Sequence, residues 1–189
     1  MDPILRDVPE EFETERLLLR APRAGDGAEM HEAIVESSEH LRLWVPWAKP
    51  NITVDEEETL QRKKRIKFLG REEFYFNMYL KGAGTLVGVI AIWNIDWGVP
   101  KFEIGYFLRT SLEGQGYATE AVNGITCFAF DQFGALRIQI TSPLQNEPSW
   151  RVAERAGYTL EGIIRNNYRD VDGNLQDSKY YSKIRMAAA

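Results

Sequence analysis

The stretch Glu113-Gly114-Gln115-Gly116-Tyr117-Ala118-Thr119-Glu120-Ala121 decides how this sequence is interpreted. An apolar run over residues 102–108 precedes it and predicts a β-strand. Apolar residues at spacings of three and four follow it, from Ala118 to Ala129, and predict a helix. This order suits phosphate binding, because glycines let an anion approach the backbone and the first N–H groups of a helix lack partners. A plain turn before a helix has the same pattern.

Length and composition suit a single globular domain. Of the 189 residues, 44% are hydrophobic and 27% are charged, which argues against disorder. We expect one domain over residues 13–186 and a short leader over residues 1–12. No apolar run approaches the roughly 20 residues that a membrane span needs, and the first seven residues lack the pattern of a secretory signal. We therefore expect a cytoplasmic protein that does not act at a membrane.

Charge, cysteine and histidine content argue against further classes of function. The net charge of −5 argues mildly against nucleic acid as a direct partner. The single cysteine, Cys127, excludes an internal disulfide and a multi-cysteine metal site, and it lies in an apolar helical run that suits core packing. His31 and His40 have no Ser or Cys motif beside them, so they indicate neither a catalytic triad nor a metal site. We expect no metal.

Hydrophobic periodicity predicts alternating strands and helices of one α/β domain. The predicted strands are residues 14–20, 74–80, 86–93, 102–108, 136–142, 158–165 and 178–185. The predicted helices are residues 27–37, 54–69, 118–129 and 147–156, the last closed by Gly157. Residues 81–84 form a hairpin signal, and short links between three successive strands predict an antiparallel meander.

The first two predicted helices carry specific expectations. Asp26 is placed to cap the first helix, which should bury Met30, Ile34 and Val35. The second helix is charged, and its acidic and basic residues lie one to two turns apart, which predicts ion pairs on a solvated face rather than nucleic-acid binding. Its expected apolar anchors are Leu60, Ile66 and Leu69.

The glycine stretch resembles the acyl-CoA-binding loop of the GCN5-related N-acetyltransferases (GNAT), Gln/Arg-x-x-Gly-x-Gly/Ala. Glu113, Gly116 and Ala118 occupy the three specified positions, and Gly114 adds a glycine. Glu113 departs from the pattern, and because a carboxylate would repel phosphates we expect it to point into solvent. The resemblance continues along the chain. Residues 146–149, 155–158 and 161–162 look like the C-terminal half of the RimJ/RimL-type branch, the ribosomal-protein N-terminal acetyltransferases. Residues 14–20 match the opening of that branch, and Asp172, Gly173 and Asp177 match its closing hairpin.

The resemblance implies a GNAT fold, a mostly antiparallel mixed sheet of six or seven strands that is flanked by helices and splayed between its fourth and fifth strands. The pantetheine arm of acetyl-CoA, the implied cosubstrate, would lie in the opening like an added strand. We map the opening between residues 106–108 and 138–140. The residues expected to contact the cofactor are Tyr106, Phe107, Leu108, Glu113, Gly114, Gln115, Gly116, Tyr117, Ala118, Thr119, Asn146 and Ser149.

Acetyl transfer to an amine needs a base, a donor to the oxyanion and a proton for the thiolate. A backbone N–H near Phe107 is the candidate oxyanion donor, by its place on the strand. Glu103, a lone acid among apolar residues, is the candidate base and would act through water. The alternative is that Glu103 faces water or pairs with an arginine.

The candidate acid is Ser149. Many GNAT enzymes use a tyrosine seven residues after the asparagine, but Ala153 stands at that place here. In the RimJ/RimL-type branch a serine takes this role, and Ser149 lies three residues after Asn146. The alternative is that Ser149 caps the helix.

The acceptor is an amine, and the resemblance points to the N-terminal α-amine of a ribosomal protein. A small-molecule amine, such as an antibiotic or a polyamine, is an alternative acceptor, and a non-catalytic acyl-CoA-binding module is an alternative function. A nucleotide-binding loop would need the Lys-Ser/Thr of a P-loop, which is missing. The exposed final hairpin offers a way to form a homodimer. Four tryptophans suit either an acceptor pocket or the core: Trp44, Trp47, Trp93 and Trp97.

Overall fold

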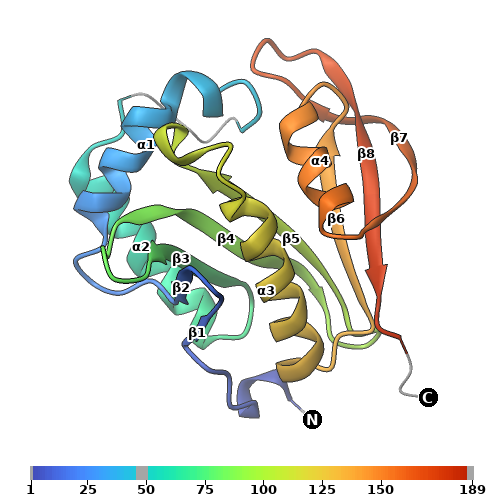
Figure 1. Ribbon diagram of the computed structural model, residues 1–189, viewed down its shortest axis with the longest axis horizontal. Helices are drawn as coiled ribbons and strands as arrows, with labels where there is room; N and C mark the ends of the chain where they lie inside the picture. The colour runs from blue at the N-terminus through green and yellow to red at the C-terminus, as the bar shows by residue number, and fades with distance from the viewer. Residues whose placement is uncertain (1, 46–50, 187–189) are drawn as a thin grey trace.

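A computed structural model of the protein describes residues 2–45 and 51–186 (Figure 1). An eight-stranded sheet carries the strands in the order β1-β2-β3-β4-β5-β6-β8-β7. The strands are β1 Glu11–Glu13, β2 Leu17–Arg20, β3 Phe74–Leu80, β4 Leu86–Asp96, β5 Lys101–Leu108, β6 Arg137–Pro143, β7 Thr159–Arg169 and β8 Leu175–Ile184. The α-helices of the described residues are α1 Gly27–Leu41, α2 Val54–Leu69, α3 Tyr117–Gln132 and α4 Glu147–Arg155. Two short 3-10 turns span Pro3–Leu5 and Thr110–Leu112.

The sheet confirms the expected fold class. It has eight strands, one more than the six or seven that were expected. The additional strand is β1, which pairs with β2 and lies mostly within the residues expected to form a leader. Strands β1 to β5 pair antiparallel with their neighbours in sequence, which confirms the meander. None of the helices in the described part of the chain is long and apolar enough to cross a membrane.

The sheet opens between β5 and β6. These strands pair in parallel over only three residues, ending at Glu103 opposite Gln139. Beyond this point β6 continues to pair with β8 as far as Pro143, while β5 continues to pair with β4 as far as Leu108. Figure 1 shows the two halves of the sheet diverging from here. Residues 106–108 therefore lie at the opening, as expected. Ile138 and Gln139 still pair with β5, so on β6 the opening begins only at Ile140.

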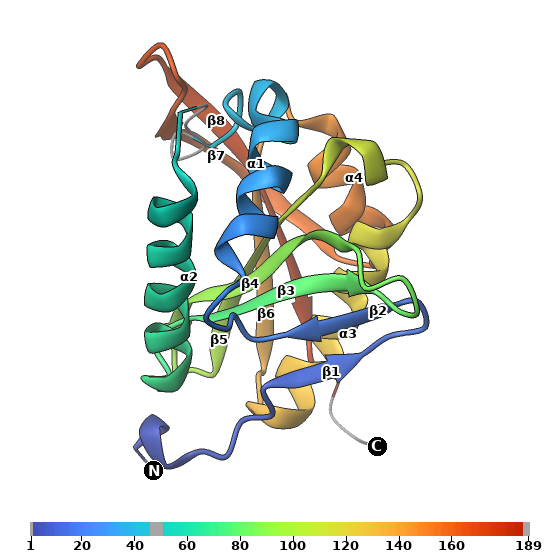
Figure 2. The same ribbon diagram turned by 90° about the vertical axis from the view of Figure 1, so that its left-hand side faces the viewer.

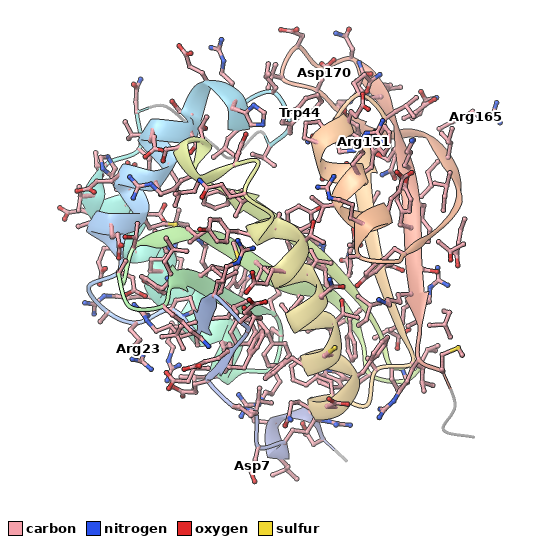
Figure 3. All side chains as sticks on the ribbon, in the orientation of Figure 1. Asp7, Arg23, Trp44, Arg151, Arg165 and Asp170 are labelled. Carbon is pink, nitrogen blue, oxygen red and sulfur yellow. The ribbon has the colours of Figure 1, made fainter. Side chains whose placement is uncertain are left out.

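The two faces of the first half of the sheet pack against different helices (Figure 2). On one face, Phe76 of β3 packs in a core with Val122 of α3, and side chains fill the space between this helix and the strands (Figure 3). On the other face, Tyr79 of β3 packs in a second cluster with Met30 and Ile34 of α1. Because successive strand residues point to opposite faces, β3 and β5 each contribute side chains to both.

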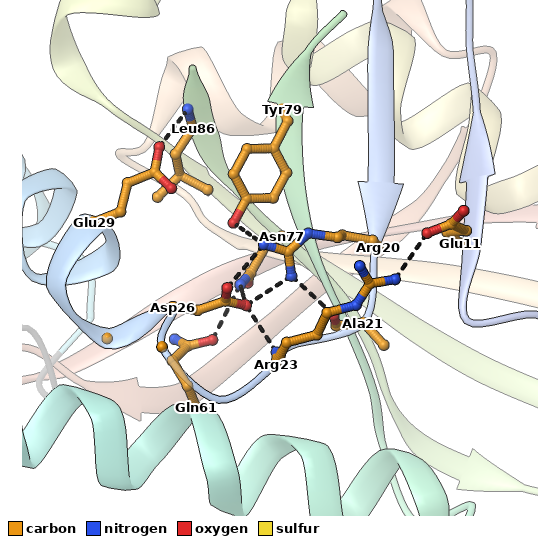
Figure 4. Close-up of polar contacts among 12 residues, drawn as sticks. Glu11, Arg20, Ala21, Arg23, Asp26, Glu29, Gln61, Asn77, Tyr79 and Leu86 are labelled. Atoms are coloured by element: carbon orange, nitrogen blue, oxygen red, sulfur yellow. Dashed lines mark hydrogen bonds and ion pairs between the residues drawn. The ribbon is translucent and has the colours of Figure 1, made fainter. Parts of the chain in front are cut away.

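The carboxylate of Asp26 joins α1 to the sheet instead of capping the helix (Figure 4). Arg20 donates to both of its oxygens at 2.8 Å, and Asn77 Nδ2 donates to one of them at 3.0 Å. Asp26 stands at the predicted N-cap position, but its side chain makes no capping hydrogen bond, because the buried guanidinium and amide offer this carboxylate stronger partners than the helix N–H groups. Met30 and Ile34 are buried as predicted, but Val35 is 44% exposed.

Helix α2 has the predicted bounds but not the predicted buried face. Thr53 and Glu56 form a capping box at its start. The three expected anchors are exposed, namely Leu60 (38%), Ile66 (66%) and Leu69 (48%). Its buried residues are instead Glu57, Gln61 and Phe68.

Polar contacts explain this reversal. Asn77 Nδ2 of β3 donates to Gln61 Oε1 at 3.1 Å, so the sheet offers α2 a hydrogen-bonding group where an apolar residue was expected to pack. A predicted ion pair within α2 is present between Arg62 and Glu58 at 2.7 Å, and Lys67 forms a further pair, not predicted, with Glu73 beyond the helix at 2.8 Å.

An ion pair between Arg137 of β6 and Glu161 of β7 holds the C-terminal strands together. Both terminal nitrogens of Arg137 donate to the carboxylate, and Ser182 Oγ donates to it at 2.5 Å. These contacts, with that of Arg137 the largest, lower the pKa of Glu161 to about 2.

Glu161→Gln should therefore reduce stability in a way that depends on pH. A lowered folded-state pKa contributes stability that is present above the ordinary value of 4.5 and is lost as the pH falls toward 2. Glu161 is 39% exposed, so we expect the variant to melt only about 1–3 °C lower at pH 7. Melting curves at pH 7, 5 and 3 should show this difference shrinking. Glu147→Gln, which removes a more exposed ion pair with Arg151, is the control. A difference for Glu161→Gln that stays constant with pH would contradict the role assigned to this ion pair.

Candidate active site

A cleft of about 930 Å³ lies at the opening between β5 and β6. Five consecutive residues of β5 line it: Ile104, Gly105, Tyr106, Phe107 and Leu108. Because these residues point alternately to the two faces of the sheet, the cleft reaches both faces. On one face α3 and α4 border it, and on the other α2, β3 and β4 do.

The register of β5 decides which backbone groups point into the opening. Arg109 N donates to Val87 O of β4 at 2.8 Å, and a Cβ at Gly88 would lie 2.1 Å from Phe107 O. The backbone groups of Phe107 therefore face β4. Since alternate residues of a strand direct these groups to opposite sides, those of Tyr106 and Leu108 point toward the opening.

The glycine loop has the geometry that its sequence suggested. Gly114 has φ +73° and Gly116 has φ +85°, a region that favours glycine. Helix α3 begins at Tyr117, and its first turn closes with the bond from Glu120 N to Gly116 O at 3.0 Å. The N–H groups that precede this bond lie at the cleft, whose lining includes Gly114, Gly116, Ala118 and Thr119.

Two residues that were expected to contact the cofactor, Gln115 and Tyr117, do not line the cleft. Arg16 Nη1 donates to Gln115 O at 3.1 Å, and the same guanidinium lies 4.4 Å from the ring centre of Tyr117. Arg16 also pairs with Glu120 at 2.6 Å, so it anchors the loop and the first turn of α3 to the start of the sheet.

Glu113 meets the expectation that it faces solvent only in part. Its side chain is 39% exposed, and its Oε1 lies 3.8 Å from His40 Nε2 at the end of α1.

The sequence did not single out a cation for this end of the cleft, but the structure places Arg155 in the lining, with Nε donating to Thr119 Oγ1 at 3.3 Å. Arg155 begins the segment 155–158 that carries part of the resemblance, but only the packing of α4 beside α3 reveals that it reaches the cleft.

The hydroxyl of Ser149 lies at the start of α4, in the cleft lining. Asn146 is the N-cap residue, and its Oδ1 accepts from Ser149 N at 3.2 Å, so the alternative that Ser149 caps this helix is wrong. Tyr106 OH donates to Ser149 O at 2.8 Å and lies 3.4 Å from Ser149 Oγ. Burial raises the pKa of Tyr106 to about 12, so its phenol stays protonated at neutral pH.

Glu103 is buried on β5 rather than facing water, and among the described residues no arginine pairs with its carboxylate. Its Oε2 accepts from Asn94 Nδ2 at 2.8 Å and from Gln139 Nε2 at 3.1 Å. Asn94 has a positive φ of 46°, at the point where the pairing of β4 and β5 becomes irregular. Glu103 is not part of the cleft lining, so its predicted role as a base would require a water between it and the cleft.

Of the four tryptophans named from the sequence, the three that the structure describes divide between cleft and core. Trp44 and Trp93 line the cleft, and Trp93 covers Gly105, where a Cβ would lie 1.7 Å from its Cη2. Trp97 packs in the core, with its ring centre 5.2 Å from that of Phe102. Trp47 lies outside the described residues. No cluster of three or more His, Cys, Asp or Glu that could hold a metal occurs within residues 2–45 and 51–186.

The chain is similar over most of its length to known acetyltransferases. A family model described as an acetyltransferase (GNAT) domain matches residues 16–159. The putative ribosomal N-acetyltransferase YdaF of Bacillus subtilis (strain 168) is 28% identical over 172 residues, which cover 90% of this chain and 92% of YdaF. The ribosomal-protein-serine acetyltransferase of Escherichia coli (strain K12) is 27% identical over 153 residues, which cover 80% of this chain and 84% of that protein.

A solved structure has the same fold. The microcin C7 self-immunity acetyltransferase MccE, in complex with acetyl-CoA and AMP, matches with a TM-score of 0.86 at 21% identity, over 94% of this chain and 98% of MccE. The family model spans more than half of the chain, so the protein belongs to the GNAT family and is an N-acetyltransferase. Its similarity to YdaF and to the Escherichia coli enzyme supports the RimJ/RimL-type branch that the sequence indicated.

Proposed function

We propose that the cleft binds acetyl-CoA and that the protein transfers the acetyl group directly to the N-terminal α-amine of a ribosomal protein. One observation supports acetyl-CoA as the cofactor: a glycine loop with two residues at positive φ opens onto the same cleft that separates β5 from β6. The pyrophosphate would meet the first N–H groups of α3 and Arg155. The pantetheine amides would pair with the backbone groups of Tyr106 and Leu108.

The same residues supply what the reaction needs. As the amine attacks the thioester, a bond forms from nitrogen to the carbonyl carbon, and the carbonyl oxygen becomes an oxyanion. We assign its donor to the N–H of Tyr106 or Leu108, the groups beside Phe107 that point toward the opening. The carbon–sulfur bond then breaks, and the Ser149 hydroxyl donates its hydrogen to the leaving thiolate while it takes a proton from water, so the hydroxyl is restored. Glu103 takes the proton of the amine through water.

The acceptor follows from the relatives rather than from the cleft. YdaF and the Escherichia coli enzyme are both named for ribosomal acceptors, and both cover most of this chain. A small-molecule amine is the second candidate, since MccE is a self-immunity acetyltransferase. A ribosomal acceptor is consistent with the expectation of a cytoplasmic protein.

The direct test incubates the purified protein with acetyl-CoA and synthetic peptides that carry the N-terminal sequences of ribosomal proteins, and measures release of free CoA. Small amines and peptides blocked at the N-terminus serve as controls. Turnover with free peptide N-termini at a kcat/KM well above that of small amines supports the proposal. Turnover with small amines alone would show that the acceptor is a small-molecule amine rather than a protein N-terminus. Binding of acetyl-CoA without turnover would favour the non-catalytic module.

Glu103→Gln tests the proposed base. The substitution keeps the shape of the side chain but removes the group that takes a proton, so kcat should fall about 100-fold or more while the affinity for acetyl-CoA stays unchanged. Calorimetry gives the affinity, and the peptide assay gives kcat. Gln139→Glu is not a suitable control because it would place a second acid beside the first. Asn94→Ala, which removes only one donor to Glu103, should have a smaller effect. An unchanged kcat in Glu103→Gln would remove Glu103 from the mechanism.

A further inference from the structure

Helix α2 presents polar side chains to the cleft, at positions where the proposed function has no use for them. Glu57, Gln61 and Lys64 lie at spacings of four and three, on one face of the helix. Glu57 is fully buried and lines the cleft, as does Lys64. A buried acid that lines a cleft calls for an explanation, because such groups are almost always paired.

Within the part of the chain that the structure describes, one of the two carboxylate oxygens of Glu57 has partners and the other has none. Gln61 Nε2 donates to Oε1 at 2.7 Å, and Lys64 Nζ lies 3.7 Å from the same oxygen. Glu57 Oε2 is buried and accepts no hydrogen bond from the described residues. A buried carboxylate oxygen without a donor destabilises the protein, so this atom is suited to accept a hydrogen bond from a molecule that enters the cleft.

A donor without a partner lies in the same cleft. Trp44 Nε1 is buried and donates no hydrogen bond to the described residues. Figure 3 shows Trp44 just beyond the C-terminal end of α1, on the side that faces α4. Among the described side chains that line the cleft, Glu57 Oε2 is therefore a buried acceptor without a donor and Trp44 Nε1–H a buried donor without an acceptor.

Glu57 of α2 and Trp44, which follows α1, both line the part of the cleft on the α1 and α2 side of the sheet. Lys64 Nζ lies 5.5 Å from the ring centre of Tyr75 of β3. Across the sheet, Tyr75 is opposite Ala91 of β4, which is opposite Gly105 of β5. Strands are about 4.8 Å apart, so Tyr75 lies about 10 Å from the strand that would hold the thioester. Side chains that reach from α2 toward β5 span part of this distance, which leaves room for the α-amine and the first peptide group of an acceptor between them and the thioester.

The charge of the site selects the kind of group it binds. Lys64 Nζ already lies 3.7 Å from Oε1, and burial lowers the pKa of this amine, so the site disfavours added charge and a neutral donor fits Oε2 better than a second cation. One acceptor together with one donor complements the C=O and N–H of a peptide group.

We propose that Glu57 and Trp44 bind the first peptide group of the acceptor, with Glu57 Oε2 accepting its N–H and Trp44 Nε1 donating to its C=O. This inference rests on the proposed function and deepens it, because it gives the enzyme a means to prefer peptide N-termini to alkyl amines. Glu57 and Trp44 are positioning residues here, and neither takes part in proton transfer.

The test uses two conjugates of CoA in which the sulfur is joined through –CH2–CO– to an amine. One carries glycinamide, which has the peptide group, and the other carries propylamine, which lacks it. Calorimetry measures the Kd of each conjugate and of free CoA. The wild-type protein should bind the glycinamide conjugate about tenfold or more tightly than the propylamine conjugate, as expected for a hydrogen bond to a charged group.

Variants separate the two contacts. Glu57→Gln should reduce this preference about tenfold, and Trp44→Phe, which keeps the ring and removes the N–H, about three- to tenfold. Affinity for free CoA and for the propylamine conjugate should stay unchanged in both. Asp55→Asn removes an exposed carboxylate from the same turn of α2 and should change nothing.

The outcomes separate this inference from the proposed function. Equal binding of the two conjugates by the wild type, or an unchanged preference in both variants, would overturn the inference while free CoA still binds. Loss of free CoA binding in both variants would also overturn it, because the residues would then be structural. Failure of the wild type to bind free CoA would instead overturn the proposed function, and the inference with it.

Discussion

Replacing Gly114 with glutamate should weaken the binding of acetyl-CoA at least about 100-fold. The new carboxylate would stand in the loop that we assign to the pyrophosphate. Two like charges 4 Å apart repel by about 4 kcal/mol at an effective dielectric constant of 20, which alone exceeds a 100-fold loss. The fold should survive, because nothing lies within 4 Å of a Cβ at this position.

The matched control is Gly114→Gln, which has the same length and the same unfavourable positive φ but no charge. It should retain binding within about tenfold, since the strain of one left-handed residue costs about 1 kcal/mol. Gly114 is a better site than Gly116, where a Cβ would lie 3.4 Å from Arg16 Nη2 and the guanidinium would neutralise a new carboxylate. Calorimetric titration with acetyl-CoA gives both affinities. Equal affinities of the Glu and Gln variants would show that the phosphates bind elsewhere.

The sequence predicted elements whose signals are local. The bounds of α2 were predicted, and the structure shows a capping box of Thr53 and Glu56 at its start, while the strand before the glycine loop followed from its apolar run. The prediction from sequence failed on the buried face of α2, because burial there depends on Asn77, a strand residue that donates a hydrogen bond to Gln61. Periodicity assumes that a buried face is apolar, and this helix buries a polar one.

The candidate site shows the same division. The glycine loop and Ser149 lie in contiguous motifs and could be found from sequence, and the cleft contains both. Arg155 reaches the cleft from α4, Trp44 from the turn after α1 and Glu57 from α2, so no spacing along the chain connects them. A buried carboxylate in a charged helix resembles its solvated neighbours in sequence, and only the packed structure distinguishes Glu57 from Glu58.

Ser149→Ala should lower kcat about 100-fold or more with little change in the affinity for acetyl-CoA. The contacts that shape this end of the cleft use the backbone of residue 149 rather than its side chain. Asn146 Oδ1 accepts from its N–H, and Tyr106 OH donates to its carbonyl oxygen, so both contacts survive the substitution. The loss therefore reports on the hydroxyl alone.

The neighbouring phenol provides the control for this prediction. Tyr106 OH lies 3.4 Å from Ser149 Oγ and stays protonated, so it is the other group that could supply the proton. If Ser149 is the acid, Tyr106→Phe should reduce kcat less than Ser149→Ala, and Ser149→Cys, which keeps a weak donor, should recover part of the loss. Peptide turnover and calorimetry of each variant give kcat and affinity separately. A larger loss in Tyr106→Phe than in Ser149→Ala would transfer the role of acid to the tyrosine, because removing the serine hydroxyl leaves the position of the phenol unchanged.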